Sequence, residues 1–309
     1  MKALAEKALD ITKLIKSQGL SAATAVVKAR MLSSQKHRSC EQRLIDVRAQ
    51  IDYERDNKRS TLIWTTHKCA STFVSRCLAA VDGVDGYHYF DYAANIYRLG
   101  NKLKLENPYL IERQGGSLLF RSYGEIYGPL RTPIEIPNRE NFVNIFFLRD
   151  PRDVLVSGYY SAAYSHTVPK HDQSRSRFIE MRRSFLSSTV DECCLRGVDD
   201  WIIPFYSQYE EFCKSSPNSH FFSYDEYQRD PETFIKSLFI KSGLSSFDKR
   251  VVRILAAQAN PVQKSPEKRT HLHQRSGSSR QFEKSLSEKT INLLNERLSS
   301  ILTYWGFKV

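Results

Sequence analysis

The stretch Thr61–Leu78, TLIWTTHKCASTFVSRCL, predicts a strand, a short loop and a helix in succession. Leu62–Thr65 is an apolar run typical of a buried strand, and the apolar residues from Phe73 onward have helical spacing. The N–H groups of the loop and of the helix N-terminus would converge on one point and attract an anion there. Lys68 adds a positive charge. The stretch is not a Walker A loop, which needs glycines and a lysine directly before Ser or Thr. An ordinary strand–turn–helix junction with an incidental lysine is the alternative interpretation.

A second predicted strand also ends in a charged motif. Asn144–Leu148, NIFFL, runs into the segment RDPRDVLVS, which begins at Arg149 and ends at Ser157. Pro151 suits the first turn of a helix, where its missing N–H costs nothing. Ligands of open α/β sheets bind outside the carboxyl ends of the strands, so we expect Arg149 and the Lys68 loop to share one crevice. A helix-capping arginine is the alternative for this motif.

Together the two segments resemble the sulfotransferases that use 3′-phosphoadenosine-5′-phosphosulfate (PAPS). Residues 67–73, HKCASTF, resemble the 5′-phosphosulfate loop of that family, P-K-S-G-T-T-W, and RDPRDVLVS is similar to its 3′-phosphate motif, R-N/D-P-x-D-x-x-x-S. The resemblance covers residues 60–309 and implies an α/β fold with a P-loop-like open parallel sheet flanked by helices. It implies transfer of a sulfuryl group from PAPS to a hydroxyl or amine acceptor, with release of 3′-phosphoadenosine-5′-phosphate (PAP). It assigns PAPS binding to Lys68, Cys69, Ala70, Ser71, Thr72, Phe73, Arg149 and Ser157.

Two weaker matches lie closer to the C-terminus. The segment that starts at Tyr224, YDE, resembles the family's Y-E-D, in which the tyrosine contacts the adenine. Arg275, Ser276 and Gly277 are similar to R-K-G, which grips the 3′-phosphate from the far side, and Arg280 stands where that motif has a second glycine. The resemblance therefore adds Tyr224, Arg275, Ser276 and Gly277 to the expected PAPS site.

The catalytic base departs from both patterns of the family. Residues 88–92, HYFDY, resemble the H-F-F-D-W segment of the glycan-type enzymes, whose glutamate base is replaced here by Gly86. SLLFRSY, residues 117–123, is predicted as a strand resembling one that ends K-T-H in the cytosolic enzymes; Arg121 keeps a cation there, but a tyrosine replaces the histidine. His88, whose ordinary pKa is near neutrality, is the expected base and Glu125 the second candidate. An aromatic-packed structural histidine is the alternative for His88.

Composition bounds the class of protein. The chain has 309 residues, 41% hydrophobic and 12% aromatic, which is enough for one large α/β domain and an appendage. It has no apolar run of the ~18–20 residues that a membrane span needs and no signal-peptide pattern, so we expect a cytoplasmic protein. The six cysteines include no C-x-x-C, and no acidic cluster suggests a metal site. The net charge of +12 indicates anionic partners, which a multiply charged PAPS satisfies without nucleic acid.

Residues 1–58 are predicted as a basic helical extension and residues 59–309 as the sulfotransferase domain. The extension has helical apolar spacing and is expected to pack on the main domain or on a second subunit, or to dock on a membrane or glycan surface. Further predicted elements are a polar loop over 165–183, a strand over 220–224, and helices over 201–213, 234–243 and 286–304. The acceptor is left open, with HYFDY favouring a carbohydrate.

Two other functions compete with sulfuryl transfer. A P-loop kinase or NTPase would need the GK[ST] signature and a strand ending in a Walker B acid, and the sequence has neither. A non-catalytic binder of acidic polymers accounts for the charge but leaves the two motifs at strand ends without a role.

Overall fold

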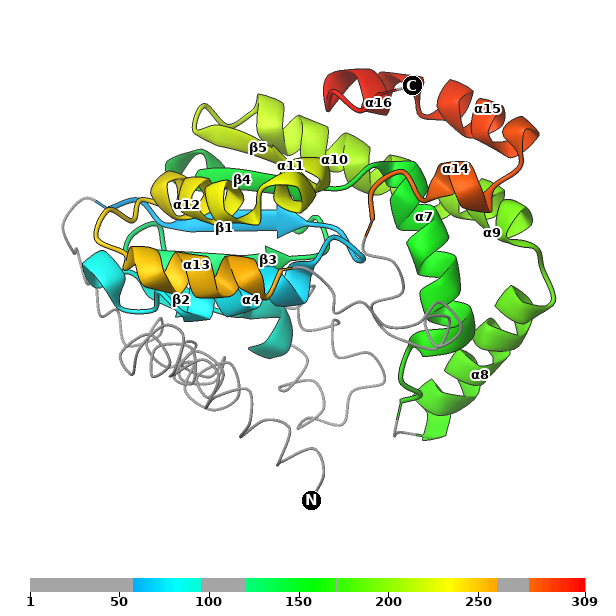
Figure 1. Ribbon diagram of the computed structural model, residues 1–309, viewed down its shortest axis with the longest axis horizontal. Coiled ribbons are helices and arrows are strands. Elements are labelled where there is room, and N and C mark those ends of the chain that lie inside the picture. Colours follow the sequence, from blue (N-terminus) through cyan, green and yellow to red (C-terminus); the bar gives the residue numbers. More distant parts are fainter. Residues whose placement is uncertain (1–57, 96–119, 170–171, 260–277, 309) are drawn as a thin grey trace.

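The computed structural model describes residues 58–95, 120–169, 172–259 and 278–308. The predicted extension over residues 1–58 therefore lies almost wholly outside the described residues. The described part is built on one five-stranded sheet in the order β2-β3-β1-β4-β5 (Figure 1). Its strands are β1 (Thr61–Thr65), β2 (His88–Phe90), β3 (Glu125–Leu130), β4 (Val143–Leu148) and β5 (Ser219–Ser223). All four strand pairs are parallel, which confirms the predicted open parallel α/β sheet.

Helices cover both faces of the sheet, as a parallel sheet requires. One face packs against α4 (Ser71–Ala79), α11 (Tyr224–Arg229), α12 (Pro231–Lys241) and α13 (Lys249–Ala257). The other packs against α7 (Pro151–Tyr160), α9 (Val190–Gly197), α10 (Ile203–Lys214), α14 (Phe282–Ser285), α15 (Glu288–Arg297) and α16 (Ser299–Tyr304). The remaining elements are α8 (Asp172–Leu186) and the short turns η1 (Val84–Gly86), η3 (Arg139–Asn141), η4 (Ser161–Ser165) and η5 (Val198–Ile202).

Successive side chains of the central strands point to opposite faces of the sheet, which produces these two cores. Trp64 belongs to the α10 side and Ile63 to the α12 side; Phe146 and Phe147 divide in the same way on β4. All four side chains are fully buried. Because the strands are parallel, their carboxyl ends lie at one edge of the sheet, toward which the arrowhead of β1 points in Figure 1. That edge faces the N-terminal ends of α4 and α7 and is where the site has to be sought.

The predicted strand–loop–helix and strand–helix units are confirmed, and three other predictions are wrong. Of the strand expected over 117–123, only residues 120–123 are described; they belong to no strand of the sheet, and β3 begins at Glu125. The polar segment expected as a loop over 165–183 contains α8, which begins at Asp172. The single helix expected over 286–304 is two helices, α15 and α16, separated at Leu298. The helix expected over 234–243 is confirmed as part of α12, and Gly243, with φ +87°, follows its C-cap Ser242 in the left-handed conformation that often ends a helix.

Candidate active site

The loop that carries Lys68 joins β1 to α4 and turns sharply without a glycine. Lys68 and Ala70 both adopt left-handed backbone conformations, with φ of 68° and 49°. Between them, the Cys69 thiol points into the core and donates to the carbonyl of Phe147 at 3.3 Å. This contact anchors the loop to β4, so the backbone N–H groups and the first turn of α4 are left to face the carboxyl edge. Burial raises the pKa of the Cys69 thiol to about 12, which keeps it protonated and unreactive.

Arg149 follows β4 directly and joins four segments that are distant in sequence. Its guanidinium donates to the Lys68 carbonyl at 3.1 Å and to the Ser278 carbonyl at 2.7 Å. It lies 3.4 Å from an Asp153 oxygen and 4.3 Å above the ring of Tyr224. The residue is only 3% exposed. Its Nε is buried without a hydrogen-bond partner among the described residues, an unmet donor that calls for an explanation.

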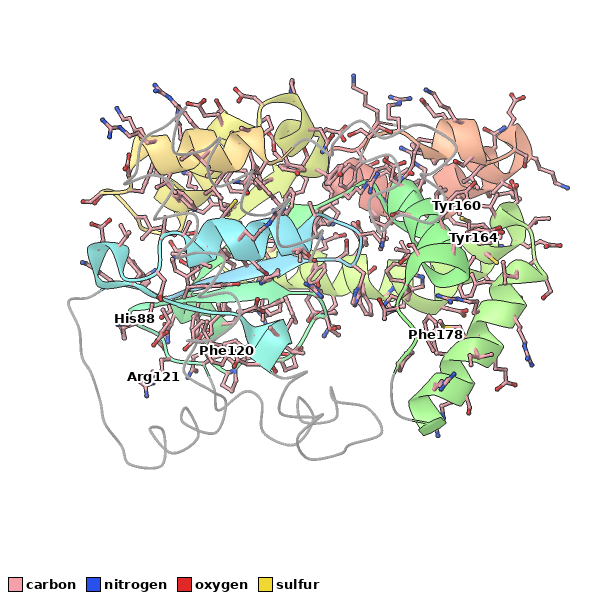
Figure 2. The ribbon with its side chains drawn as sticks, turned by 60° about the horizontal axis from the view of Figure 1, so that its bottom comes forward. His88, Phe120, Arg121, Tyr160, Tyr164 and Phe178 are labelled. Atoms are coloured by element: carbon pink, nitrogen blue, oxygen red, sulfur yellow. The ribbon has the colours of Figure 1, made fainter. Side chains whose placement is uncertain are left out.

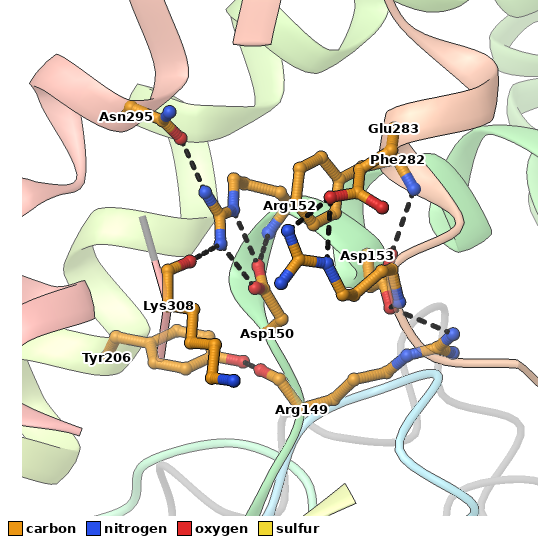
Figure 3. Close-up of polar contacts among 10 residues, drawn as sticks. Arg149, Asp150, Arg152, Asp153, Tyr206, Phe282, Glu283, Asn295 and Lys308 are labelled. Carbon is orange, nitrogen blue, oxygen red and sulfur yellow. Dashed lines mark hydrogen bonds and ion pairs between the residues drawn. The ribbon is translucent and has the colours of Figure 1, made fainter. Parts of the chain in front are cut away.

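Asp153 fixes both the arginine and the loop opposite. Its carboxylate accepts from the backbone N–H groups of Arg280 at 2.8 Å and Phe282 at 3.0 Å, in addition to its contact with Arg149 (Figure 3). Burial raises its pKa, while the Arg149 charge acts in the opposite direction. Arg280 has φ +56°, a conformation that favours glycine, at the position where the sequence motif has glycine. The Arg280 side chain points instead to an exposed pair with Glu283.

The second arginine of the motif has a structural role that the sequence pattern did not reveal. Arg152 is 1% exposed and makes a two-pronged contact with Asp150 at 3.0 and 2.6 Å. It also donates to Asn295 and to the Lys308 carbonyl, and its guanidinium lies 4.2 Å from the ring centre of Phe282 (Figure 3). Arg152 therefore ties the C-terminal helices to α7, while Arg149 faces the crevice.

The other predicted PAPS-binding residues occupy different positions around this crevice. Ser157 is half-buried, two turns into α7. Ser71 and the exposed Thr72 form the first turn of α4, whereas Phe73 packs in the core against Tyr227 at 5.1 Å between ring centres. Tyr224 opens α11 and is buried beneath Arg149. Arg275, Ser276 and Gly277 lie outside the described residues.

A group of cations that sequence reasoning missed lies on the other side of Lys68. Arg131 directly follows β3, whose last residue, Leu130, pairs with Trp64 of β1. Arg131 therefore emerges beside the loop that carries His67. Partial burial, followed by the charges of Arg131, Lys68 and His166, lowers the pKa of His67 to about 4, although His67 keeps an exposed surface. The unusual β3 sequence, with Gly and Pro at 128 and 129, concealed this strand end.

The same cations act on Lys68. Burial, followed by Arg149 and Arg131, lowers the pKa of its ammonium to about 8. Within the described ranges, no carboxylate forms an ion pair with Lys68, Arg131 or His67. Cations that gather without an ion-paired carboxylate, as these three residues do, are suited to hold anions.

The expected base candidates lie elsewhere. His88 and Glu125 are register partners at the first residues of β2 and β3, and β3 then pairs with β1 near Thr61. They are therefore at the amino edge of the sheet, opposite to the edge that holds Lys68. Arg121 also precedes β3, and its backbone N–H donates to Tyr127. In Figure 2, His88 and Arg121 lie far from Tyr160, at the end of α7. The expectation that these three residues flank the sulfuryl group is corrected by this topology.

Two observations concern only the described residues. Among them, no group of three or more His, Cys, Asp or Glu side chains is arranged to hold a metal ion. None of the described helices has the length and apolar character needed to cross a membrane.

In fold, the chain is similar to mouse sulfotransferase SULT7A1 complexed with PAP, with 12% identity, a TM-score of 0.46, and 85% of this chain and 89% of that chain covered. It is also similar to retinol dehydratase in complex with androsterone and inactive cofactor PAP, with 17% identity, a TM-score of 0.44, and 84% and 85% covered. No curated protein sequence matches. The model of the sulfotransferase domain matches residues 139–305, more than half of the chain, and the chain therefore belongs to the sulfotransferase family.

Proposed function

We propose that this sulfotransferase uses PAPS as its sulfuryl donor and that Arg149 recognises the 3′-phosphate. The observation that carries the proposal is the environment of Arg149: a buried guanidinium, stacked on Tyr224 and held by Asp153, with its Nε unpaired among the described residues. A phosphate accepts charge-assisted hydrogen bonds from such a group. Ser157 on α7 would add a hydroxyl donor, and Tyr224 a ring against which the adenine packs. The sequence resemblance also assigns contacts with this phosphate to Arg275, Ser276 and Gly277, which lie outside the described residues.

The Lys68 loop would hold the phosphosulfate end. The N–H groups of residues Cys69 to Thr72 lie at the loop and first turn of α4, where unpaired donors and the helix dipole favour an anion. When bound there, PAPS supplies a sulfuryl group whose bond to the bridging oxygen breaks as the acceptor's oxygen or nitrogen bonds to sulfur, the electron pair passing to PAP. Lys68 stabilises the charge that develops on the bridging oxygen.

The acceptor's proton needs a base at the carboxyl edge, and the amino-edge residues His88 and Glu125 are not placed to serve it. We propose His67 for this role, because it directly precedes Lys68 and its lowered pKa keeps the imidazole neutral at pH 7. The acceptor class remains a hydroxyl or amine compound. Residues 59–309 would form the catalytic domain, and a cytoplasmic location is compatible with the sequence.

Calorimetric titration with PAP and with 5′-AMP, which lacks the 3′-phosphate, tests the assignment of Arg149. The wild-type chain should bind PAP at least about 10–100-fold more tightly, since hydrogen bonds to charged groups contribute ~1.5–3 kcal/mol. In Arg149→Ala this preference should disappear while binding of 5′-AMP persists. Arg149→Lys keeps the charge and guards against a folding defect, and Arg297→Ala removes an exposed arginine as the matched control. An unchanged preference for PAP in Arg149→Ala would overturn the assignment.

A further inference from the structure

The order of the strands divides the carboxyl edge into two sides. Lys68 follows the central strand β1, while Arg149 and Tyr224 follow β4 and β5 on one side of it. Arg131 follows β3, on the other side of β1. A donor whose phosphate lies at Arg149 and whose sulfuryl end lies at Lys68 occupies the first side. The reacting partner must then approach from the second side, where Arg131 lies.

Arg131 differs from Arg149 and Arg152 in its contacts with the described part of the protein. Its Nε is buried and has no hydrogen-bond partner in the described part of the chain, and no described carboxylate forms an ion pair with it. Arg152, by contrast, is matched by Asp150, and Arg149 by Asp153. A partly buried guanidinium without a counter-charge is costly unless a ligand supplies one.

The neighbours of Arg131 strengthen the positive charge on this side. His67 and Lys68 lie close enough for Arg131 to lower the pKa of each, and His166 acts on His67 from the end of η4. His166 is held in place because Arg182 of α8 donates to its carbonyl and, through Nε, to the Ala162 carbonyl at 3.0 Å. Of the described groups that lower the pKa of His67, Arg131 and Lys68 are cationic and none is a carboxylate. A neutral acceptor would leave them uncompensated.

We propose that the acceptor is itself an anion, a hydroxyl or amine compound that carries a carboxylate, sulfate or phosphate group, and that Arg131 binds this group on the β3 side of Lys68. The proposal rests on the proposed function, because it needs the donor to occupy the Arg149 side. It narrows the acceptor class and gives Arg131 a binding role separate from the chemistry at sulfur. The planar guanidinium selects oxyanions by paired hydrogen bonds.

Matched acids and amides test the proposal on the full chain saturated with PAP. The probes are 4-hydroxybenzoate against 4-hydroxybenzamide, glucuronate against glucuronamide, and lactate against lactamide, each titrated by calorimetry. We expect at least one acid to bind roughly tenfold or more tightly than its amide, as for a hydrogen-bonded ion pair. Arg131→Gln should reduce that ratio to about twofold or less, and Arg131→Lys should retain part of it. Arg253→Gln, which alters an exposed arginine of α13, should leave it unchanged.

Three results are decisive. If no acid is preferred over its amide by the PAP-bound wild type, the proposal is overturned. It also fails if the preference survives in Arg131→Gln. With PAPS present, Arg131→Gln should raise KM for the preferred acid more than KM for its amide; an equal loss of kcat for both, without that difference in KM, would assign Arg131 to the chemistry instead. If the wild type does not bind PAP, this result refutes the proposed function separately, before any acceptor is tested.

Discussion

Binding of PAP at pH 8 should draw a proton onto Lys68. In the unliganded chain, burial and then the charges of Arg149 and Arg131 lower the pKa of Lys68 to about 8, so about half of the molecules carry a neutral amine at pH 8. A bound 5′-phosphate places negative charge at the loop and should return the pKa toward the ordinary value near 10.4. The expected uptake is therefore roughly 0.5 proton per PAP at pH 8, rising to ~0.9 at pH 9 and falling to ~0.1 at pH 7.

Calorimetry in several buffers measures this number, since the slope of the observed enthalpy against the buffer's ionisation enthalpy equals the protons taken up. The phosphates of PAP do not interfere, because their second pKa is about 6 and they are already ionised at pH 8. Protons are taken up and not released, because the pKa of Lys68 is expected to be higher in the PAP complex than in the unliganded chain. Lys68→Met should bind PAP without this uptake. A slope of zero in the wild type at pH 8–9, or the same slope in Lys68→Met, would refute the placement of the phosphate beside Lys68.

Two more predictions concern Arg152 and His67. Arg152→Met should lower the free energy of unfolding by about 3–5 kcal/mol in urea titrations, because it strands the buried Asp150, whereas Arg297→Met in an exposed pair should cost about 0–1 kcal/mol. Equal effects would show that Arg152 does not hold the C-terminal helices. The wild-type kcat/KM, which reports the free enzyme, should not fall between pH 8 and about pH 6, because His67 remains neutral in the unliganded chain over this range. His67→Gln should lower kcat by about 10²–10⁴-fold. A near-normal rate in His67→Gln would exclude it as the base.

The sequence predicts best where local pattern and tertiary environment agree. Around Lys68 and Arg149, an apolar run is followed by a polar turn and helical spacing, and the parallel sheet brings the two strand ends together. The contacts of Arg149 could not be anticipated in the same way. They join Lys68, Ser278 and Tyr224, which are separated by many residues and meet only because β1, β4 and β5 are neighbours.

The prediction failed at β3 because the strand lacks the usual signals. Glu125, Gly128 and Pro129 are all poor strand residues, and the more apolar segment before them was assigned instead. The fold selects Gly128 for space: a Cβ there would lie 2.9 Å from the Cβ of Ile63. The pairing with β1 is irregular at this point, between Leu62 and Trp64. The predicted strand ended at Tyr123, whereas β3 ends just before Arg131. The sequence analysis therefore did not predict the cations beside Lys68, where we propose that the acceptor binds.

The charges at the carboxyl edge connect the proposed donor site with the proposed acceptor site. Desolvation and the charge of Arg131 hold the pKa values of Lys68 and His67 below their ordinary ranges in the unliganded chain, with Arg149 also acting on Lys68 and Lys68 on His67. A donor phosphate beside Lys68 and an acceptor anion beside Arg131 would each remove part of that repulsion. Lys68 would then regain the proton it shares with the leaving oxygen, and His67 would become a stronger base for the acceptor. Both changes would require occupied sites, so the proposal couples the proton affinities of Lys68 and His67 to the binding of donor and acceptor.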